Sequence, residues 1–402
     1  MLPIIANCDI LLTVIILTEK LYDSNSYLTE FEAEVISCNE ADGYYKVILN
    51  KTAFFPEEGG QYSDKGTLGD SEVFDVQIEN GEIVHYCRQS LTGTVTGKLN
   101  FERRFRNMQN HTGEHVISGL IHSLFGGENV GFHLGEDEVT CDYDIELNEE
   151  QLNKVEFLAN EAVYKNLSVT GYYPSESELK NTKYRSKKEI NEALRIVTID
   201  GVDCCACCAP HVKTTAEVGV IKILSSMRLR SGIRLFIACG KDAYLDYAAK
   251  HSQIKAVGAL LASKGEDCAE KVERLIKSNK EAVYKINTLL NEINGLKLKN
   301  IEKTDKTLVL FTPCNDKKQL IDLVNKAKEK SGNMCAAFGG DEISGYIYIV
   351  HSEDDRLPEF IKNMNTILSG RGGGKVPMCQ GSVRASMTKI ADFFTNAEII
   401  KL

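Results

Sequence analysis

The spacing of hydrophobic and polar positions changes several times along the chain, and each change predicts a different kind of element. From Ser26 to about Lys98, short runs that alternate apolar and polar residues are separated by glycines, which is typical of strands and turns. These runs are FEAEVISC, GYYKVILN, SEVFDVQIE, GEIVHYC and LTGTVTGKL. They predict a small β-barrel. The loop TAFFPEEGGQYSDKGTL contains Gly59 and Gly60, where the backbone can approach a ligand closely.

From about Arg103 the period lengthens to that of an amphipathic helix, NMQNHTGEHVISGLIHSLFG, which should end at Gly126 and Gly127. The chain after it should contain, in order, strands in VGFHLG and EVTCDYDIEL, a helix from about Asn148 to Asn166, a helix near Lys187, and strands in RIVTID and GIRLFIACG. Helices mixed with antiparallel strands predict the α+β class.

The last third of the chain divides into two patterns. From Lys241 to about Asn300 it is rich in Lys, Glu, Ala and Leu without proline, which predicts two long helices or a helical hairpin. Alternation returns in KTLVLF, CAAFGG and GYIYIV, with a helix near FIKNMNTIL, so a small α/β domain is expected at the end. The predicted domains are a leader (1–17), the barrel (18–98), an α/β domain (99–240), a helical linker (241–300) and the C-terminal domain (301–402).

The apolar run Ile10–Leu17 has no basic cluster before it and is too short to span a bilayer. It is interpreted as a buried strand or a disordered leader. No other run approaches transmembrane length, so a soluble cytoplasmic protein without a membrane partner is predicted.

Composition narrows the class further. The 402 residues are 43% hydrophobic and 26% charged with a net charge of -10, which argues against coating nucleic acid by bulk charge but leaves room for a local basic face. The 13 cysteines are odd in number, and four crowd together at Cys204, Cys205, Cys207 and Cys208. A reduced compartment with thiols available to a metal fits this pattern better than a disulfide framework.

Two short pairs predict a metal site. His111 and His115 are four residues apart on the predicted helix and share one face, and Cys207 and His211 have the same spacing 92 residues after His115. A four-ligand nitrogen and sulfur set suits zinc. Each pair alone is weak evidence for a metal site. The histidines could be ordinary helix residues, and the CxxC pairs among Cys204 to Cys208 could form a separate structural site.

HTGEH is also an HxxEH motif, in which Glu114 would be the general base of a zinc peptidase. Such an enzyme normally completes its site with a downstream carboxylate, whereas here a Cys-His pair follows. A non-catalytic, zinc-stabilised RNA-binding module is the third alternative.

The segments RRFRNMQNHTGEHVISGL and CCACCAPHVKTTAEVGVIKI resemble the editing domain shared by alanyl-tRNA synthetases and the free-standing AlaX editing proteins. FFPEEGGQYSDKGTL is similar to the glycine-rich loop of the accompanying barrel, and SGRGGGKVPMCQGSV to the C-terminal domain of alanyl-tRNA synthetase. The motifs span roughly residues 20 to 385 in the family's order, without a large aminoacylation domain before them. The sequence departs from the family at Ala209 and Pro210, at Glu114, and at Cys379 and Ser382.

The resemblance implies a long-form AlaX-type editing protein with zinc held by His111, His115, Cys207 and His211. It would act in trans as a zinc-dependent aminoacyl-tRNA hydrolase. Its partner would be tRNA(Ala) charged with serine or glycine, and Ala-tRNA(Ala) would be spared. Zinc could activate water or anchor the substrate's amino group, with RNA hydroxyls or Glu114 activating water instead. A homodimer through the C-terminal region is also considered.

Selecting serine needs a polar partner for its hydroxyl, because rejection of alanine then follows from unpaired polar groups. The candidates are Thr52, Gln109, Thr112 and Glu114, each of which could equally be a cap or surface residue. Two basic clusters flank the proposed site in sequence: Arg103, Arg104 and Arg106, then Arg228, Arg230 and Arg234. They are candidates for contacting acceptor-stem phosphates, but each could equally belong to a solvated charged face. SGRGGGK lacks the Ser or Thr of a P-loop, so a backbone turn or nest is expected there, with Arg371 and Lys375 as phosphate contacts.

In the barrel loop, Gly59 and Gly60 are expected near the substrate.

Overall fold

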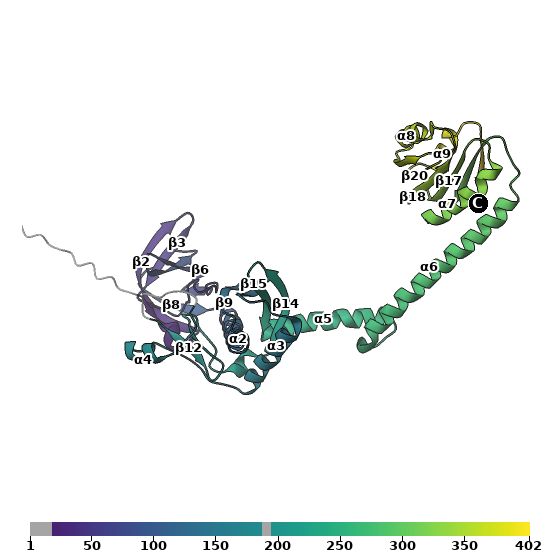
Figure 1. Cartoon of the computed structure of the whole chain (residues 1–402). Coiled ribbons are helices and arrows are strands. Elements are labelled where there is room, and N and C mark those ends of the chain that lie inside the picture. The colour runs from purple at the N-terminus through teal and green to yellow at the C-terminus, as the bar shows by residue number, and fades with distance from the viewer. Residues whose placement is uncertain (1–17, 187–193) are drawn as a thin grey trace, which may run out of the picture. The chain divides into compact units, whose positions relative to one another are not determined.

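The computed structural model describes residues 18–186 and 194–402. It divides into two compact units, Met1–Gln253 and Ile254–Leu402. The predicted leader and the helix expected near Lys187 lie outside the described residues. The mixed α+β class is confirmed by the helices and sheets of both units (Figure 1).

Six antiparallel strands near the N-terminus pair in a closed ring, in the order β2-β3-β7-β6-β5-β8. Their bounds are β2 Glu30–Ala41, β3 Tyr44–Leu49, β5 Gly66–Leu68, β6 Ser71–Glu79, β7 Glu82–Cys87 and β8 Thr94–Leu99. Short elements at one end are β1 (Glu19–Lys20), α1 (Leu21–Ser24) and β4 (Lys51–Thr52). Alternate residues such as Phe31 and Ala33 point inward and pack with Phe54 and Phe55, so the period-two pattern produces the core.

Helix α2 (Phe101–Phe125) is the central element of the first unit, and it positions the site described below. Asn100 caps its first turn by accepting a hydrogen bond from the Arg103 amide, and Gly126, at φ +73°, ends it in the left-handed conformation. The side chains from Asn107 to Gly119 are all buried, because sheets and helices cover this stretch on several sides.

The elements around α2 include two antiparallel sheets. The four-stranded sheet runs β14 (Ile221–Leu229), β15 (Gly232–Cys239), β10 (Val139–Tyr143) and β9 (Asn129–Leu134). The three-stranded sheet runs β11 (Val169–Tyr172), β12 (Ile196–Ile199) and β13 (Asp203–Ala206). Helix α3 (Glu149–Tyr164), with an Asn148–Gln151 capping box, the short α4 (Glu176–Asn181) and the 3-10 turn η1 (Thr215–Val218) complete the unit.

Two long helices follow, α5 (Lys241–Leu260) and α6 (Cys268–Lys299), with the 3-10 turn η2 (Gly265–Asp267) between them. The prediction of long helices in this stretch is confirmed. Of the α6 side chains, Cys268, Asn294 and Leu298 are buried, so most of this helix is exposed.

The C-terminal domain is a six-stranded mixed sheet with helices. Its strands, in spatial order, are β19 (Arg371–Lys375), β20 (Met378–Val383), β18 (Gly345–His351), β17 (Cys335–Asp341), β16 (Thr307–Thr312) and β21 (Ala397–Lys401). The helical elements are α7 (Lys317–Ala327), the 3-10 turn η3 (Lys328–Lys330), α8 (Leu357–Ile367) and α9 (Met387–Phe393).

The glycine-rich segment RGGGK was expected to form a turn or nest, and this expectation is wrong. It forms the exposed edge strand β19, paired antiparallel with β20. Glycine is required at Gly372, where φ is +141° and a Cβ would lie only 2.3 Å from the Gln380 carbonyl oxygen.

No helix within residues 18–186 and 194–402 is long and apolar enough to cross a membrane.

Candidate metal centre

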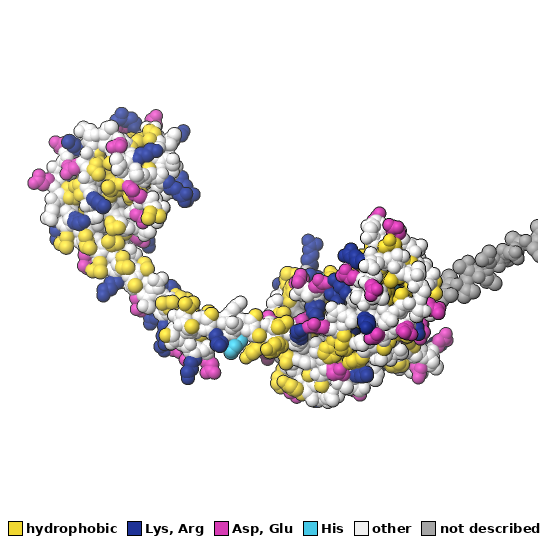
Figure 2. Space-filling model, turned by 180° about the vertical axis from the view of Figure 1, so that it is seen from behind, with side chains coloured by type: hydrophobic (Ala, Val, Ile, Leu, Met, Phe, Trp, Pro, Cys, Tyr) yellow, Lys and Arg dark blue, Asp and Glu magenta, His cyan; other side chains and the backbone are white. Residues whose placement is uncertain are grey.

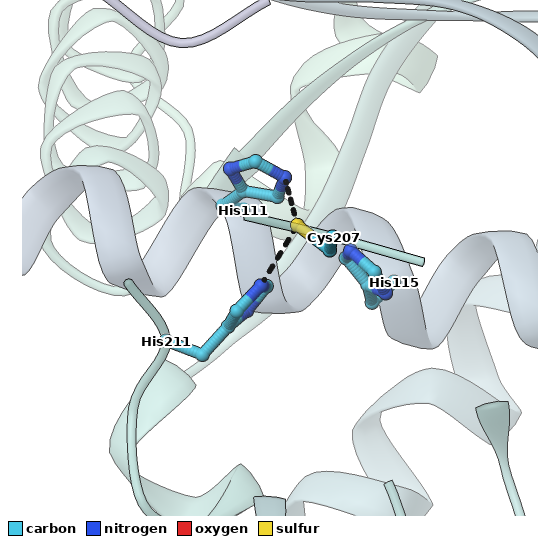
Figure 3. A group of neighbouring side chains, drawn as sticks. All are labelled: His111, His115, Cys207 and His211. Carbon is cyan, nitrogen blue, oxygen red and sulfur yellow. Dashed lines mark hydrogen bonds between the residues drawn. The ribbon is translucent and has the colours of Figure 1, made fainter. Parts of the chain in front are cut away.

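Four side chains from two distant segments converge beside the buried middle of α2. His111 and His115 project from successive turns of the helix, and Cys207 and His211 come from the loop after β13 (Figure 3). The Cys207 Sγ lies 3.5 Å from His111 Nε2 and 3.3 Å from His211 Nε2. One ligand atom from each of the four lies within 4.8 Å of the others, so the group could hold a metal ion.

These separations can be tested against the geometry of a metal. With zinc–nitrogen distances of about 2.0 Å and a zinc–sulfur distance of about 2.3 Å, tetrahedral coordination separates sulfur from nitrogen by about 3.5 Å. The observed sulfur–nitrogen distances agree with this value. The donor set therefore fits a tetrahedral ion.

Each of the three histidines makes a hydrogen bond through Nδ1 to a side chain outside the group. His111 contacts Gln61 Oε1, His211 contacts Thr112 Oγ1, and His115 contacts Asp203 Oδ2, each at 2.9 Å. These bonds fix the ring orientation and leave Nε2 available as a ligand atom, which is the usual arrangement around protein-bound metals.

The environment also favours the protonation states that bind metal. Burial raises the pKa of Cys207, but the His111 and His211 rings outweigh burial and hold that pKa well below its usual value. Burial lowers the pKa of His211 to about 3, although Cys207 opposes the shift. A thiolate and a neutral imidazole are thus the favoured forms of these two side chains.

The glycine-rich loop of the barrel lies directly against this group. Gly59 and Gly60 have φ values of +63° and +83°, and a Cβ on Gly60 would lie 2.2 Å from the Phe132 carbonyl oxygen. The Gly60 carbonyl accepts a hydrogen bond of 2.7 Å from the Leu134 amide. This contact between the loop and β9 brings Gln61 to His111.

Comparisons with known proteins relate this chain to tRNA editing proteins. A family model described as "Threonyl and Alanyl tRNA synthetase second additional domain" matches residues 194–236, the segment that carries Cys207 and His211. The chain is 25% identical to the alanyl-tRNA editing protein AlaX-L of Pyrococcus horikoshii, over 94% of this chain and 97% of that protein. It is 28% identical to the alanyl-tRNA editing protein Aarsd1-A of Xenopus laevis, over 88% and 91%.

The chain is thus similar over nearly its whole length to AlaX-type alanyl-tRNA editing proteins. It is also 30% identical to the alanine–tRNA ligase of Methanococcus vannielii, but the match covers 93% of this chain and only 43% of the ligase. The chain therefore spans less than half of that ligase and nearly all of the editing proteins.

Among the residues considered for serine selection, Thr112 makes a hydrogen bond to the metal group, through His211. Thr52 contacts His85 Nε2 at 2.8 Å and accepts from the Phe54 amide, so its hydroxyl serves the barrel. Gln109 donates to the Glu217 carbonyl. These contacts argue against a substrate role for Thr52 and Gln109.

Glu114 is buried, and its Oε1 accepts hydrogen bonds from Ser118 and Asn129. Its Oε2 lies 3.9 Å from His115 Nε2, so the carboxylate stands beside the metal group. The downstream partner that an HxxEH peptidase needs would be a carboxylate, yet His211 and Cys207 occupy that place. The peptidase alternative finds no support in this geometry.

Arg104 was considered as a phosphate contact, and this is wrong. Its side chain is fully buried and ion-paired with Asp64, and it donates to the carbonyls of Ser26 and Ala53. It ties the barrel to α2.

The other basic candidates differ in how far they reach solvent. Arg103 and Arg106 donate to the 135–136 loop, and Arg234 pairs with Asp142. Arg228 is exposed although it pairs with Glu146. The remaining candidates are also exposed, namely Arg230, Arg371 and Lys375.

Three further residues complete the site although no sequence motif pointed to them, namely Gln61, Asp203 and Arg185. Gln61 directly follows Gly60 and Asp203 directly precedes the cysteine cluster, so both positions carried a weak signal. Arg185 carried none, because only the pairing of its backbone with that of Cys204 and Ala206 brings it to the site.

Proposed function

We propose that this protein hydrolyses the ester bond between a wrong amino acid and tRNA(Ala), acting in trans. The single observation that carries the proposal is the group formed by His111, His115, Cys207 and His211. It occurs in a chain that matches 97% of the length of AlaX-L. An ester is an activated bond, so a positioned water and a polarised carbonyl suffice for its hydrolysis.

We propose zinc as the ion of this site, because one thiolate and three imidazoles at tetrahedral separations suit it. When bound, zinc supplies a Lewis-acid centre for the ester carbonyl or for the amino group of the substrate. With four protein ligands, the anchoring role is favoured over water activation. Glu114, beside His115, is the candidate for accepting a proton from the attacking water.

The proposed substrate is Ser-tRNA(Ala), with Gly-tRNA(Ala) as a second, and Ala-tRNA(Ala) is spared. Thr112 supports serine selection. With Nε2 of His211 facing the metal group, its Nδ1 carries the proton and donates to Thr112 Oγ1, which also accepts from the Val212 amide at 3.4 Å. The Thr112 hydroxyl therefore keeps its own proton to donate to the substrate hydroxyl.

The tRNA itself would contact exposed cations such as Arg230, Arg371 and Lys375. The proposal places the protein in the cytoplasm, where thiols such as Cys207 stay reduced.

The decisive experiment compares hydrolysis of Ser-tRNA(Ala), Gly-tRNA(Ala) and Ala-tRNA(Ala) by the purified protein. A His111→Ala, His115→Ala double variant should leave Ser-tRNA(Ala) charged. His122→Ala is the matched control, because His122 lies on the same helix with its side chain 47% exposed and paired with Glu128. Intact Ser-tRNA(Ala) with the wild-type protein would overturn the proposal, and equal loss of all three substrates would refute the selectivity.

We also propose that two copies pair through α6. An exposed apolar stripe follows a seven-residue repeat along this helix, with Val272, Ile286 and Ile293 at one core position and Leu275, Leu289 and Leu296 at the other. The stripe is about 36 Å long at 1.5 Å per residue, and Figure 2 shows hydrophobic side chains exposed on this helical stretch. β-Branched and leucine residues alternating in this way, with one polar Asn279 in the stripe, favour a two-stranded coiled coil.

A further inference from the structure

Behind His115, on the side away from Cys207, the structure places a chain of two further charged side chains. Asp203 Oδ2 contacts His115 Nδ1 at 2.9 Å. The Arg185 guanidinium donates two hydrogen bonds to the same carboxylate, from Nε to Oδ1 at 2.8 Å and from Nη2 to Oδ2 at 2.9 Å. Little of any of these three side chains reaches solvent, so the interactions are weakly screened.

The arrangement is anchored through the backbone. Arg185 donates its amide to the Cys204 carbonyl at 2.8 Å and accepts from the Ala206 amide at 2.9 Å. It therefore pairs with the strand that begins at Asp203 and leads into Cys207. Strand β13 thus begins with the outer partner of one candidate ligand, His115, and leads into another, Cys207.

His115, Asp203 and Cys205 could also be taken as a second metal group, since their ligand atoms lie close together. The charges argue against it. The Arg185 cation contacts both oxygens of Asp203, which disfavours a second cation there.

We propose that Asp203, oriented by Arg185, is the positioning residue that fixes His115 with Nε2 toward the metal and so sets how tightly the site holds zinc. The inference rests on the proposed zinc site but not on the deacylation reaction. A carboxylate that accepts the Nδ1 proton holds one tautomer and one ring orientation and makes Nε2 a stronger donor. Arg185 in turn holds the carboxylate in one rotamer, which a lone aspartate would not keep.

The test measures zinc affinity directly, by competition with a chromophoric chelator. Asp203→Asn keeps the size of the side chain but removes its charge, and it should weaken zinc binding by about 10- to 100-fold. Arg185→Gln leaves Asp203 in place and should cause a smaller loss. The two losses should not add in the double variant, because both act through the same bond to His115.

Asp142→Asn is the matched control. Arg234 grips Asp142 with the same two-bond geometry, at 2.6 and 2.7 Å, and neither side chain belongs to the metal group. The control should keep wild-type zinc affinity. If Asp203→Asn fails to fold, as judged by circular dichroism, Arg185→Gln alone carries the test.

Two outcomes overturn the inference: wild-type zinc affinity in a folded Asp203→Asn or Arg185→Gln variant, or an equal loss in Asp142→Asn. A second readout separates positioning from general damage. At saturating zinc, Asp203→Asn should recover most of its kcat with an unchanged KM for the tRNA. Weakened zinc binding in a protein that shows no deacylation would sustain this inference while refuting the proposed function.

Discussion

At the scale of single residues, the site is determined by which ring atom each histidine presents. Gln61, Thr112 and Asp203 each engage a different Nδ1, so three imidazoles face Cys207 with Nε2. Two of these partners, Gln61 and Asp203, come from segments other than α2. The outer contacts therefore orient the three histidines as a metal site would require, whereas the four-residue spacing of the candidate ligands alone is weak evidence for such a site.

Thr112→Val is expected to reduce the preference for serine. The substitution keeps the shape of the side chain but removes the hydroxyl that would meet the serine hydroxyl and contact His211. The ratio of Ser-tRNA(Ala) to Ala-tRNA(Ala) hydrolysis should fall by about 10-fold or more, since unpaired polar groups give the selectivity. The measurement is kcat/KM on both substrates. Thr112→Ser keeps the hydroxyl and should retain the ratio. An unchanged ratio in Thr112→Val would remove Thr112 from the selectivity proposal.

A second prediction at this scale concerns His85 in the barrel. Burial lowers its pKa to about 4, against an ordinary value of 6.5, although its bond to the Val47 carbonyl opposes the shift. Because the folded state binds this proton less tightly than the unfolded state, the contribution of neutral His85 to the free energy of unfolding is complete above pH 6.5. It is lost as the pH falls from 6.5 to 4. At 1.36 kcal/mol per pKa unit the loss amounts to about 3 kcal/mol.

Denaturant unfolding of the wild type and His85→Gln at pH 7.5 and pH 4.5 measures this pH-dependent contribution to the free energy of unfolding. The wild type should lose more stability between the two pH values than the variant does. Other titrating groups are common to both proteins and cancel in the comparison. The same pH dependence in both would show that His85 does not hold a lowered pKa.

At the scale of elements, the contact between the glycine-rich loop and β9 is the one that sequence patterns could not supply. Gly60 packs against the Phe132 carbonyl, and this contact sets where Gln61 stands relative to His111. Local patterns found the loop and the strand separately. Their packing depends on backbone atoms, which carry no sequence signal apart from the glycine.

Gly60→Ala tests this contact. At φ +83° alanine is strained, and its Cβ would also meet backbone 2.2 Å away, so the loop must move. Gly43→Ala is the control, because Gly43 has φ +85° and nothing within 4 Å of a Cβ. The control should cost about 1 kcal/mol of unfolding free energy from backbone strain alone, whereas Gly60→Ala should cost more and also weaken zinc binding. Equal effects of the two substitutions on stability and zinc affinity would exclude a role for the close contact.

At the scale of the whole molecule, the exposed stripe of α6 is the feature that the single chain leaves unexplained. Apolar side chains such as Leu275 and Ile286 are 59% and 56% exposed in the chain alone. A stripe that repeats every seven residues buries itself when a second helix packs along it.

Ile286→Glu should therefore shift the protein toward monomer. Sedimentation equilibrium of the wild type should give about twice the chain mass of 44.7 kDa, and the variant should give a mass near a single chain. Tyr284→Glu is the control, since Tyr284 is 75% exposed on the same helix but lies off the stripe. A monomeric wild type, or equal dissociation by both variants, would contradict pairing through the stripe.

The sequence by itself determined most of the elements and the candidate ligand residues. Period-two runs located the barrel strands, a longer period located α2, and the order of three motifs assigned His111, His115, Cys207 and His211 to one site. These features are local, or are joined by a resemblance, and so they can be recognised along the chain.

Only the tertiary structure decided what each polar residue is for. Arg104 and Arg230 are both candidates for RNA contact in the sequence, yet one is buried against Asp64 and the other is exposed. Arg185 reaches His115 only through Asp203, 88 positions after that histidine. A charged side chain gains its role from the partner that burial brings to it, and that partner is chosen by packing between segments far apart in sequence.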